Sequence, residues 1–103
     1  MPKCKICCLY SGSRGNSVYV EAGGAKILID AGKSARALCS ALKGINVVID
    51  SIDAIFITHE HTDHVCGLSV FAAKHKIPVY APNGTLLALK QKGTLCEKHI
   101  DIT

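Results

Sequence analysis

The chain has 103 residues, of which 49% are hydrophobic and 19% are charged. This length is enough for one hydrophobic core and too short for two ordinary domains, and such an apolar composition excludes a disordered chain. Twelve Lys and Arg residues against eight Asp and Glu residues give a net charge of +4, a mild surplus that favours anionic partners without requiring one.

The apolar runs are too short to cross a membrane. Segments 27–29 and 47–49 each end at a charged residue, far below the ~18 residues that a spanning helix needs. After the basic start of the chain, no apolar stretch of signal-peptide length precedes the polar segment 11–17. We therefore expect a cytoplasmic protein with no membrane partner.

The six cysteines are Cys4, Cys7, Cys8, Cys39, Cys66 and Cys96. A disulfide framework is disfavoured because three of them crowd into a strand-like segment and no secretory signal is visible. A zinc clamp that joins Cys4 and Cys7 to Cys96 and His99 is also disfavoured, because alternation along a strand puts Cys4 and Cys7 on opposite faces. We expect reduced thiols.

The first elements follow from turn chemistry. Residues 4–9 predict a strand, and residues 11–17 predict a polar loop punctuated by glycine. Residues 18–21 and 26–30 predict a hairpin, because the Gly23–Gly24 pair accepts the positive φ angles of a tight turn.

Helical spacing appears in three segments. Ser34 predicts the cap of a helix that ends at Gly44, and its apolar positions are Ala35, Leu38, Cys39 and Leu42. Residues 66–76 predict a second helix, and residues 84–92 predict a third that is capped by Asn83.

Strands alternate with these helices. Residues 54–58 read as a short strand buried on both faces, and residues 78–81 as another. No repeat or linker divides residues 1–103. A hairpin followed by alternating helices and strands predicts a single α/β domain with a mixed sheet and helices.

Four potential metal ligands follow the strand 54–58 within six residues: His59, His61, Asp63 and His64. The carboxyl end of a strand in an α/β sheet is where ligands bind. The spacing lets His59 and His61 converge on one cation. Asp63 and His64 then point elsewhere and can bind a second. Imidazole and carboxylate donors suit Zn²⁺, with Mn²⁺ or Fe²⁺ as alternatives.

Such a pair of ions supports hydrolysis, because a bound water loses its proton near neutral pH and Asp63 can orient that nucleophile. The alternative is a solvated, His-rich loop without metal, which is disfavoured so close to a core strand. A phosphate-binding loop at Gly32–Lys33–Ser34 is a weaker alternative. The glycine expected five residues before Gly32 is Ile27, so Ser34 reads as a helix cap and Lys33 as facing solvent.

Segment 58–67 resembles the HxHxDHxxG motif of the metallo-β-lactamase-fold hydrolases. Segment 28–32 resembles the strand-ending Asp-x-Gly of that family, which implies that Asp30 steadies the metal ligands. Segment 11–17 resembles the SGSxGNS loop of the nuclease-like, WalJ/YycJ-type branch. There, Ser11 or Asn16 could contact a substrate phosphate, and a plain loop is the alternative.

The family's fold is an αββα sandwich of two similar halves, and this chain resembles the N-terminal half. The resemblance implies that the later metal ligands belong to the other half, so two protein ligands per ion predict weak metal affinity and feeble turnover. His99 as a missing ligand is less favoured than a surface His99, and His75 reads as a packing or surface residue. One sheet face would expose apolar surface, which predicts a homodimer or other self-association.

The resemblance implies a metal-dependent hydrolase, and the nuclease-like loop favours a phosphodiesterase or exonuclease acting on DNA or RNA. His59, His61, Asp63 and His64 would hold two divalent ions, with Asp63 and His64 as catalytic residues. Hydrolysis of a thioester, lactone or lactam stays an alternative, because one fold serves many reactions. A non-catalytic fragment that binds metal or partners is the other alternative.

Overall fold

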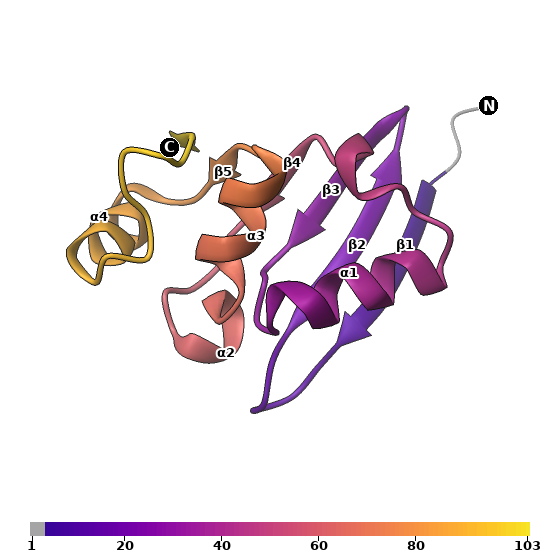
Figure 1. The fold of residues 1–103 in the computed structure, drawn as a ribbon, viewed down its shortest axis with the longest axis horizontal. Helices are drawn as coiled ribbons and strands as arrows, with labels where there is room; N and C mark the ends of the chain where they lie inside the picture. Colours follow the sequence, from indigo (N-terminus) through magenta and orange to yellow (C-terminus); the bar gives the residue numbers. More distant parts are fainter. Residues whose placement is uncertain (1–3) are drawn as a thin grey trace.

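The computed structural model describes residues 4–103 (Figure 1). The strands are β1 (Cys4–Tyr10), β2 (Ser17–Ala22), β3 (Ala25–Ile29), β4 (Ala54–Phe56), β5 (Val79–Tyr80) and β6 (Asp101–Ile102). The helices are α1 (Ala35–Gly44), the 3-10 helix η1 (Ile49–Ser51), α2 (Thr62–Val65), α3 (Leu68–His75) and α4 (Asn83–Gln91). The strands lie side by side in chain order, β1-β2-β3-β4-β5-β6.

The sheet is mixed, as predicted. β1, β2 and β3 pair antiparallel, while β3, β4, β5 and β6 pair parallel. The predicted hairpin is confirmed: Gly23 and Gly24 have φ angles of 56° and 83°, which are the positive values that a tight two-residue turn requires. The parallel strands are joined by segments that carry helices, because a parallel connection must cross the sheet.

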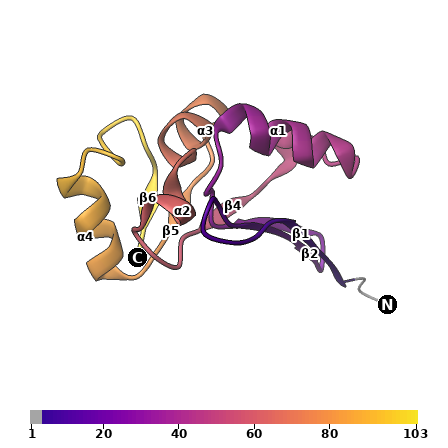
Figure 2. The same ribbon diagram turned by 90° about the horizontal axis from the view of Figure 1, so that it is seen from below.

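The helices cover one face of the sheet. In Figure 2, α1 and α3 lie on the same side of β1 to β4. Register aligns four fully buried side chains across that face, namely Tyr19, Leu28, Ile55 and Val79. Leu38 and Leu42 from α1 and Leu68 and Phe71 from α3 belong to the same buried cluster. This layer is the hydrophobic core of the chain.

The opposite face is apolar and bare. Register aligns one side chain from every strand across it, in a row that we call the bare row: Cys8, Val18, Ile29, Phe56, Tyr80 and Ile102. No helix covers this side of β1 to β4 in Figure 2. Phe56 is 41% exposed and Ile102 is 38% exposed, which is high for large apolar residues in a sheet.

Several predicted boundaries need correction. The Ser34 cap is confirmed, since its Oγ accepts the Ala37 N–H at 3.2 Å. The predicted helix 66–76 corresponds to α3, which begins at Leu68 and ends at His75, and the short helix α2, which precedes it at residues 62–65, was not predicted. The predicted Asn83 cap is wrong: Asn83 is the first residue of α4, and the capping position is Pro82, which makes no side-chain bond.

Strand lengths differ as well. The predicted strand 54–58 ends at Phe56, and 78–81 shortens to Val79–Tyr80. The prediction that 54–58 is buried on both faces is wrong, because Phe56 lies on the uncovered face of the sheet. β6 has only two residues and was not predicted from the sequence. Within residues 4–103 no helix is long and apolar enough to span a membrane.

None of the six cysteines is joined to another in the structure, and the reduced state of the thiols stays a prediction. Cys4 and Cys7 lie on β1, at one edge of the sheet. Cys96 and His99 lie just before β6, at the other edge. A zinc clamp that joins these two pairs therefore does not form.

Candidate metal site

Three loops meet where β3 and β4 end, and backbone hydrogen bonds join them. The Asn16 N–H donates to the Asp63 carbonyl at 2.8 Å, and the Gly32 N–H donates to the Asn16 carbonyl at 2.9 Å. The Ala31 N–H donates to the His64 carbonyl at 2.8 Å. The loop 11–17, the segment after β3 and the histidine motif therefore form one connected unit.

Two glycines allow this close approach. A Cβ on Gly32 would overlap the Asp63 carbonyl and the Asn16 nitrogen, and a Cβ on Gly67 would overlap the Lys33 carbonyl. Only a residue without a side chain fits such backbone contacts. The Gly67 N–H also donates to the Ala31 carbonyl at 2.8 Å and not back into α2, so α3 begins after Gly67 and not at Cys66 as predicted.

Asp30 lies at the centre of the unit with an unusual backbone. Its φ is 63°, in the left-handed region that Asp tolerates better than most side chains, and it is 5% exposed. The Asp30 N–H donates to the Phe56 carbonyl at 2.7 Å, and the Ser17 hydroxyl donates to the Asp30 carbonyl at 2.8 Å. These bonds hold the residue after β3 in place.

The Asp30 carboxylate accepts three hydrogen bonds. Oδ1 accepts the Thr58 N–H at 2.8 Å, and Oδ2 accepts the Thr58 hydroxyl at 2.6 Å. Oδ2 also lies 2.7 Å from Nδ1 of His64. Because an ionised carboxylate only accepts, Nδ1 carries the proton and Nε2 of His64 keeps its lone pair. Thr58 therefore supports the site, a role that was not predicted from the sequence.

The four predicted ligands gather at this edge of the sheet. Asp63 Oδ2 lies 3.6 Å from His64 Nε2, and it accepts a bond from the Asn16 amide at 3.3 Å. The His59 ring centroid lies 4.9 Å from that of His64 and 6.1 Å from that of His61. An imidazole and a carboxylate that face each other suit a divalent cation.

These four side chains do not make a complete set of ligands for a metal ion. Within residues 4–103, no three His, Cys, Asp or Glu side chains form a group that could hold a metal ion. His64 and Asp63 are therefore a two-donor arrangement, and His59 and His61 are more exposed side chains beside it. The ligand roles and the support by Asp30 stay predictions.

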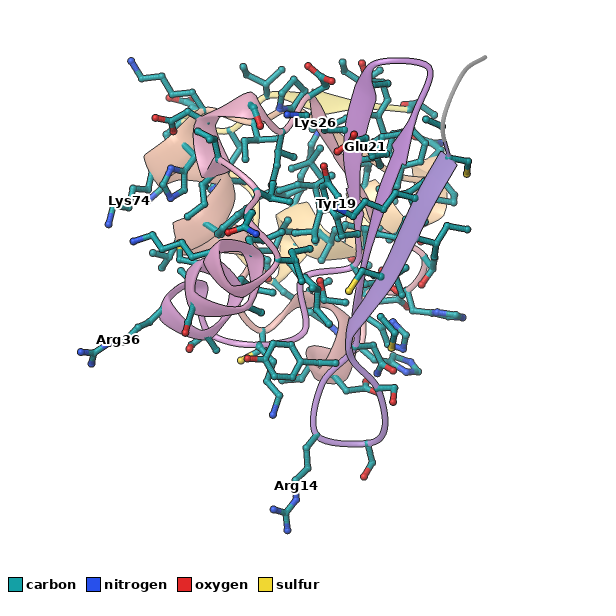
Figure 3. All side chains as sticks on the ribbon, turned by 90° about the vertical axis from the view of Figure 1, so that its right-hand side faces the viewer. Arg14, Tyr19, Glu21, Lys26, Arg36 and Lys74 are labelled. Atoms are coloured by element: carbon teal, nitrogen blue, oxygen red, sulfur yellow. The ribbon has the colours of Figure 1, made fainter. Side chains whose placement is uncertain are left out.

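The loop 11–17 borders this edge. The Asn16 side chain donates to the Gly12 carbonyl at 2.8 Å and accepts the Gly12 N–H at 3.2 Å, so it shapes the loop as well as contacting Asp63. Ser11 is exposed, and Arg14 points away from the molecule (Figure 3). The predicted solvent-facing Lys33 is corrected: it is half-buried, and its ammonium lies 5.3 Å from the Tyr10 ring centroid.

The two remaining histidines lie elsewhere. The preference for a surface His99 is wrong, because this residue is 8% exposed. Its Nε2–H donates to the Ser69 carbonyl at 2.8 Å and its Nδ1 accepts the Cys96 N–H at 3.1 Å, so neither nitrogen is left for a metal. His75 packs against Phe71 with ring centroids 5.1 Å apart, as the packing interpretation predicts.

The sequence profile described as the metallo-beta-lactamase superfamily matches residues 10–100. The chain belongs to this superfamily. Membership of the metallo-beta-lactamase superfamily implies divalent metal ions, and the donors at the strand ends fit that chemistry.

Sequence relatives of this metallo-beta-lactamase chain include two bacterial proteins with nuclease names. It is 42% identical over 101 residues to "Exodeoxyribonuclease WalJ" of Streptococcus pneumoniae serotype 2, a match that covers 93% of this chain and 38% of the relative. It is 43% identical over 82 residues to "Exodeoxyribonuclease YycJ" of Bacillus anthracis, covering 80% and 31%. The chain thus spans about a third of the length of these relatives.

Solved structures show the same metallo-beta-lactamase fold. The Rm3 metallo-beta-lactamase superposes with a TM-score of 0.68 at 25% identity, over 82% of this chain and 32% of that one. The metallo-beta-lactamase fold protein YhfI from Bacillus subtilis gives a TM-score of 0.71 at 20% identity, over 97% of this chain and 44% of that one. The mixed sheet with helices is therefore part of a known larger fold.

Proposed function

We propose that this chain is the N-terminal, metal-binding part of a metal-dependent exonuclease or other phosphodiesterase that acts on nucleic acid. The observation that carries the proposal is the arrangement of His64, whose Nδ1 lies 2.7 Å from the Asp30 carboxylate while its Nε2 faces Asp63 at 3.6 Å. A histidine oriented in this way is a typical metal ligand. The nuclease names of the relatives support the substrate class.

The proposed ligand set has two parts. His59 and His61 would bind one divalent ion, and Asp63 and His64 would bind a second, with Zn²⁺ favoured and Mn²⁺ or Fe²⁺ as alternatives. Bound divalent ions lower the pKa of a coordinated water and stabilise negative charge on the reacting phosphate.

This chain's own residues would prepare that chemistry. Asp30 holds the tautomer of His64, and the Asn16 amide contacts the Asp63 carboxylate at 3.3 Å and limits its rotation. Asp63 would accept a proton from the attacking water. Ser11, which is exposed on the loop 11–17, and Asn16 would contact a substrate phosphate. The net charge of +4 supports a polyanionic substrate.

The proposal includes the extent of the domain. Since two ligands per ion come from this chain and it spans 38% of the WalJ relative, the remaining ligands would come from the rest of a longer domain. The 103 residues alone would bind metal weakly and self-associate through the bare row, as a homodimer. The cytoplasmic location stays a prediction.

A non-catalytic, metal-binding role is the second candidate. It would rest on the pair of donors Asp63 and His64, which lie 3.6 Å apart, without the further ligands that catalysis needs. Hydrolysis of a thioester, lactone or lactam stays open as an alternative reaction on the same fold.

The test compares the 103-residue chain with the same chain joined to the C-terminal segment of the Streptococcus pneumoniae relative. Metal content is measured by mass spectrometry, and activity is measured on bis-p-nitrophenyl phosphate, double-stranded DNA, RNA and a thioester. We expect the joined protein to bind metal and cleave the phosphodiesters, and His64→Ala to abolish both. Glu60→Gln, a substitution in the same motif at a residue that we do not propose as a ligand, is the matched control.

A joined protein that carries no metal would overturn the hydrolase proposal. A protein that carries metal but cleaves none of the four substrates would favour the binding role.

A further inference from the structure

A second chemical cluster lies on the helical side of the sheet, between α1, η1 and α3. It contains one thiol, one imidazole and one carboxylate, from Cys39, His75 and Asp50. Cys39 Sγ lies 3.8 Å from His75 Nε2, and His75 Nδ1 lies 3.2 Å from Asp50 Oδ1. None of these residues belongs to the candidate metal site.

The contacts of the His75 ring determine which of its nitrogens carries the proton and which faces the thiol. The Asp50 carboxylate accepts, so Nδ1 of His75 carries the proton and Nε2 presents its lone pair to the Cys39 thiol. The ring is held against Phe71, and the His75 side chain is only 14% exposed, while Asp50 is 84% exposed. A thiol, a base and a carboxylate that orients the base are the arrangement of an activated sulfur nucleophile.

Cys39 can be reached from solvent and lies among cations. It lines a cavity of about 580 Å³, and the rim includes Arg36, Lys43 and Lys74. The described residues that line this cavity include no carboxylate, and the Asp50 carboxylate contacts the ring nitrogen of His75 that is turned away from Cys39. In Figure 3, Arg36 and Lys74 both project outward on the helical side of the molecule. Three cations around one thiol favour a small reagent that carries negative charge.

We propose that Cys39 is a thiol-exchange site for small, carboxylate-bearing disulfides. The Cys39 thiol gives its proton to His75 Nε2, and its sulfur attacks one sulfur of the disulfide. A new S–S bond forms, the old one breaks, and the departing thiolate takes the proton from His75. Cys39 is oxidised to a mixed disulfide and the leaving sulfur is reduced to a thiol, so no other oxidant is needed.

The other cysteines provide an internal comparison. Four other cysteines are more exposed than the half-buried Cys39, namely Cys4, Cys8, Cys66 and Cys96. If exposure alone set the reaction rate, Cys39 would react more slowly than these four. Cys96 Sγ also lies near a histidine, at 3.6 Å from His99 Nδ1, but that nitrogen already accepts the Cys96 N–H. Activation by His75 therefore predicts that Cys39 reacts fastest, whereas exposure alone predicts that the exposed cysteines react faster than Cys39.

The first experiment treats the reduced full chain with less than one equivalent of oxidised glutathione and locates the adduct by peptide mass spectrometry. We expect Cys39 to carry most of the adduct, with a rate at least about tenfold above that of Cys66. An adduct spread over the exposed cysteines, with Cys39 no faster than Cys66, would overturn the proposal.

The second experiment removes the base. His75→Gln should slow the reaction of Cys39 at least about tenfold and leave Cys66 unchanged. Asp50→Asn keeps the test valid if His75→Gln fails to fold, because Asp50 is largely exposed and its loss leaves the core intact. We expect Asp50→Asn to slow Cys39 severalfold. An unchanged Cys39 rate in the folded variants would show that the cluster does not activate the thiol.

The third experiment tests the selection of anions. The Arg36→Gln/Lys74→Gln double variant should slow Cys39 with the anionic reagent dithiobis(nitrobenzoate) and not with neutral dithiodipyridine. Lys92→Gln, which removes an exposed charge just after α4, is the matched control. Equal effects on both reagents would overturn the preference for carboxylate-bearing disulfides.

Discussion

Asp30 combines a backbone requirement with a chemical one. Its left-handed φ of 63° favours Gly, Asn and Asp, which tolerate this backbone region better than most other residues. Its carboxylate accepts hydrogen bonds from Thr58 and His64 at the same time, so the side chain at this position must supply two acceptor oxygens. Both conditions fall on a residue just after a strand, where the side chain is 8% exposed.

Asp30→Asn separates these two requirements. Asn tolerates the same φ, so we expect the fold to persist, while His64 loses its charged acceptor and Zn²⁺ affinity of the joined protein falls about 10- to 100-fold. Calorimetric titration with Zn²⁺ measures the change. Asp53→Asn is the control, because Asp53 accepts the Lys26 N–H far from the motif. Equal affinities for the two variants would contradict the role of Asp30.

Tyr19 gives a pH dependence of stability. Burial raises the pKa of this phenol well above its usual range, and the hydrogen bond to Glu21 at 2.7 Å adds to the effect (Figure 3). In the unfolded chain the phenol ionises near pH ~10. The stabilisation is therefore complete below that pH and is lost as pH rises toward the folded-state value.

Urea unfolding at pH ~8 and pH ~11 measures this loss. We expect the free energy of unfolding to fall at the higher pH, and Tyr19→Phe to make that fall smaller. Tyr80→Phe, on the bare face, should leave it unchanged. An undiminished fall in Tyr19→Phe would mean that other groups cause it.

Local signals predicted some elements and tertiary contacts decided others. The hairpin at Gly23–Gly24 and the Ser34 cap depend on neighbouring residues only, so the sequence was sufficient. The break between α2 and α3 at Gly67 depends on a bond to Ala31, which no local pattern reveals. β6 has two residues and exists because it pairs with β5, so its own composition carries little signal.

In the candidate site, too, the local sequence predicted some features and tertiary contacts decided the others. His59, His61, Asp63 and His64 lie within six residues, so their proximity could be predicted. The bond from Thr58 to Asp30 spans 28 residues and required the parallel pairing of β3 with β4. The cluster of Cys39, His75 and Asp50 required the packing of α1 against α3, so no local pattern in the sequence could predict it.

Gly32→Ala tests the contact between elements. A Cβ at Gly32 collides with backbone atoms of Asp63 and Asn16, and backbone yields less readily than a flexible side chain. We expect a loss of about 1–3 kcal/mol in the free energy of unfolding, measured with urea. Gly44→Ala, at the end of α1 with open space around it, should cost nothing and could stabilise by a few tenths of a kcal/mol. Equal effects of the two substitutions would contradict the close-approach argument.

At the scale of the whole molecule, the chain has one covered and one uncovered sheet face. The covered face holds the fully buried side chains, and the uncovered face presents the bare row across all six strands. Exposed Phe56 and Ile102 raise the free energy of the isolated chain in water. Any second layer that buries this row would stabilise the fold.

Phe56→Lys tests the proposed self-association. A charge in the middle of the bare row should resist burial, so we expect the dimer to weaken and the monomer to dominate in sedimentation equilibrium. Leu87→Lys is the matched control, because Leu87 is 57% exposed on α4, outside the bare row. A compact monomer of the unmodified chain at high concentration would contradict the dimer.

The spatial order of the strands repeats their order along the chain. Each strand can therefore join the open edge of the sheet as it leaves the ribosome, and no earlier strand has to move aside. Synthesis and sheet growth run in the same direction, from β1 toward β6.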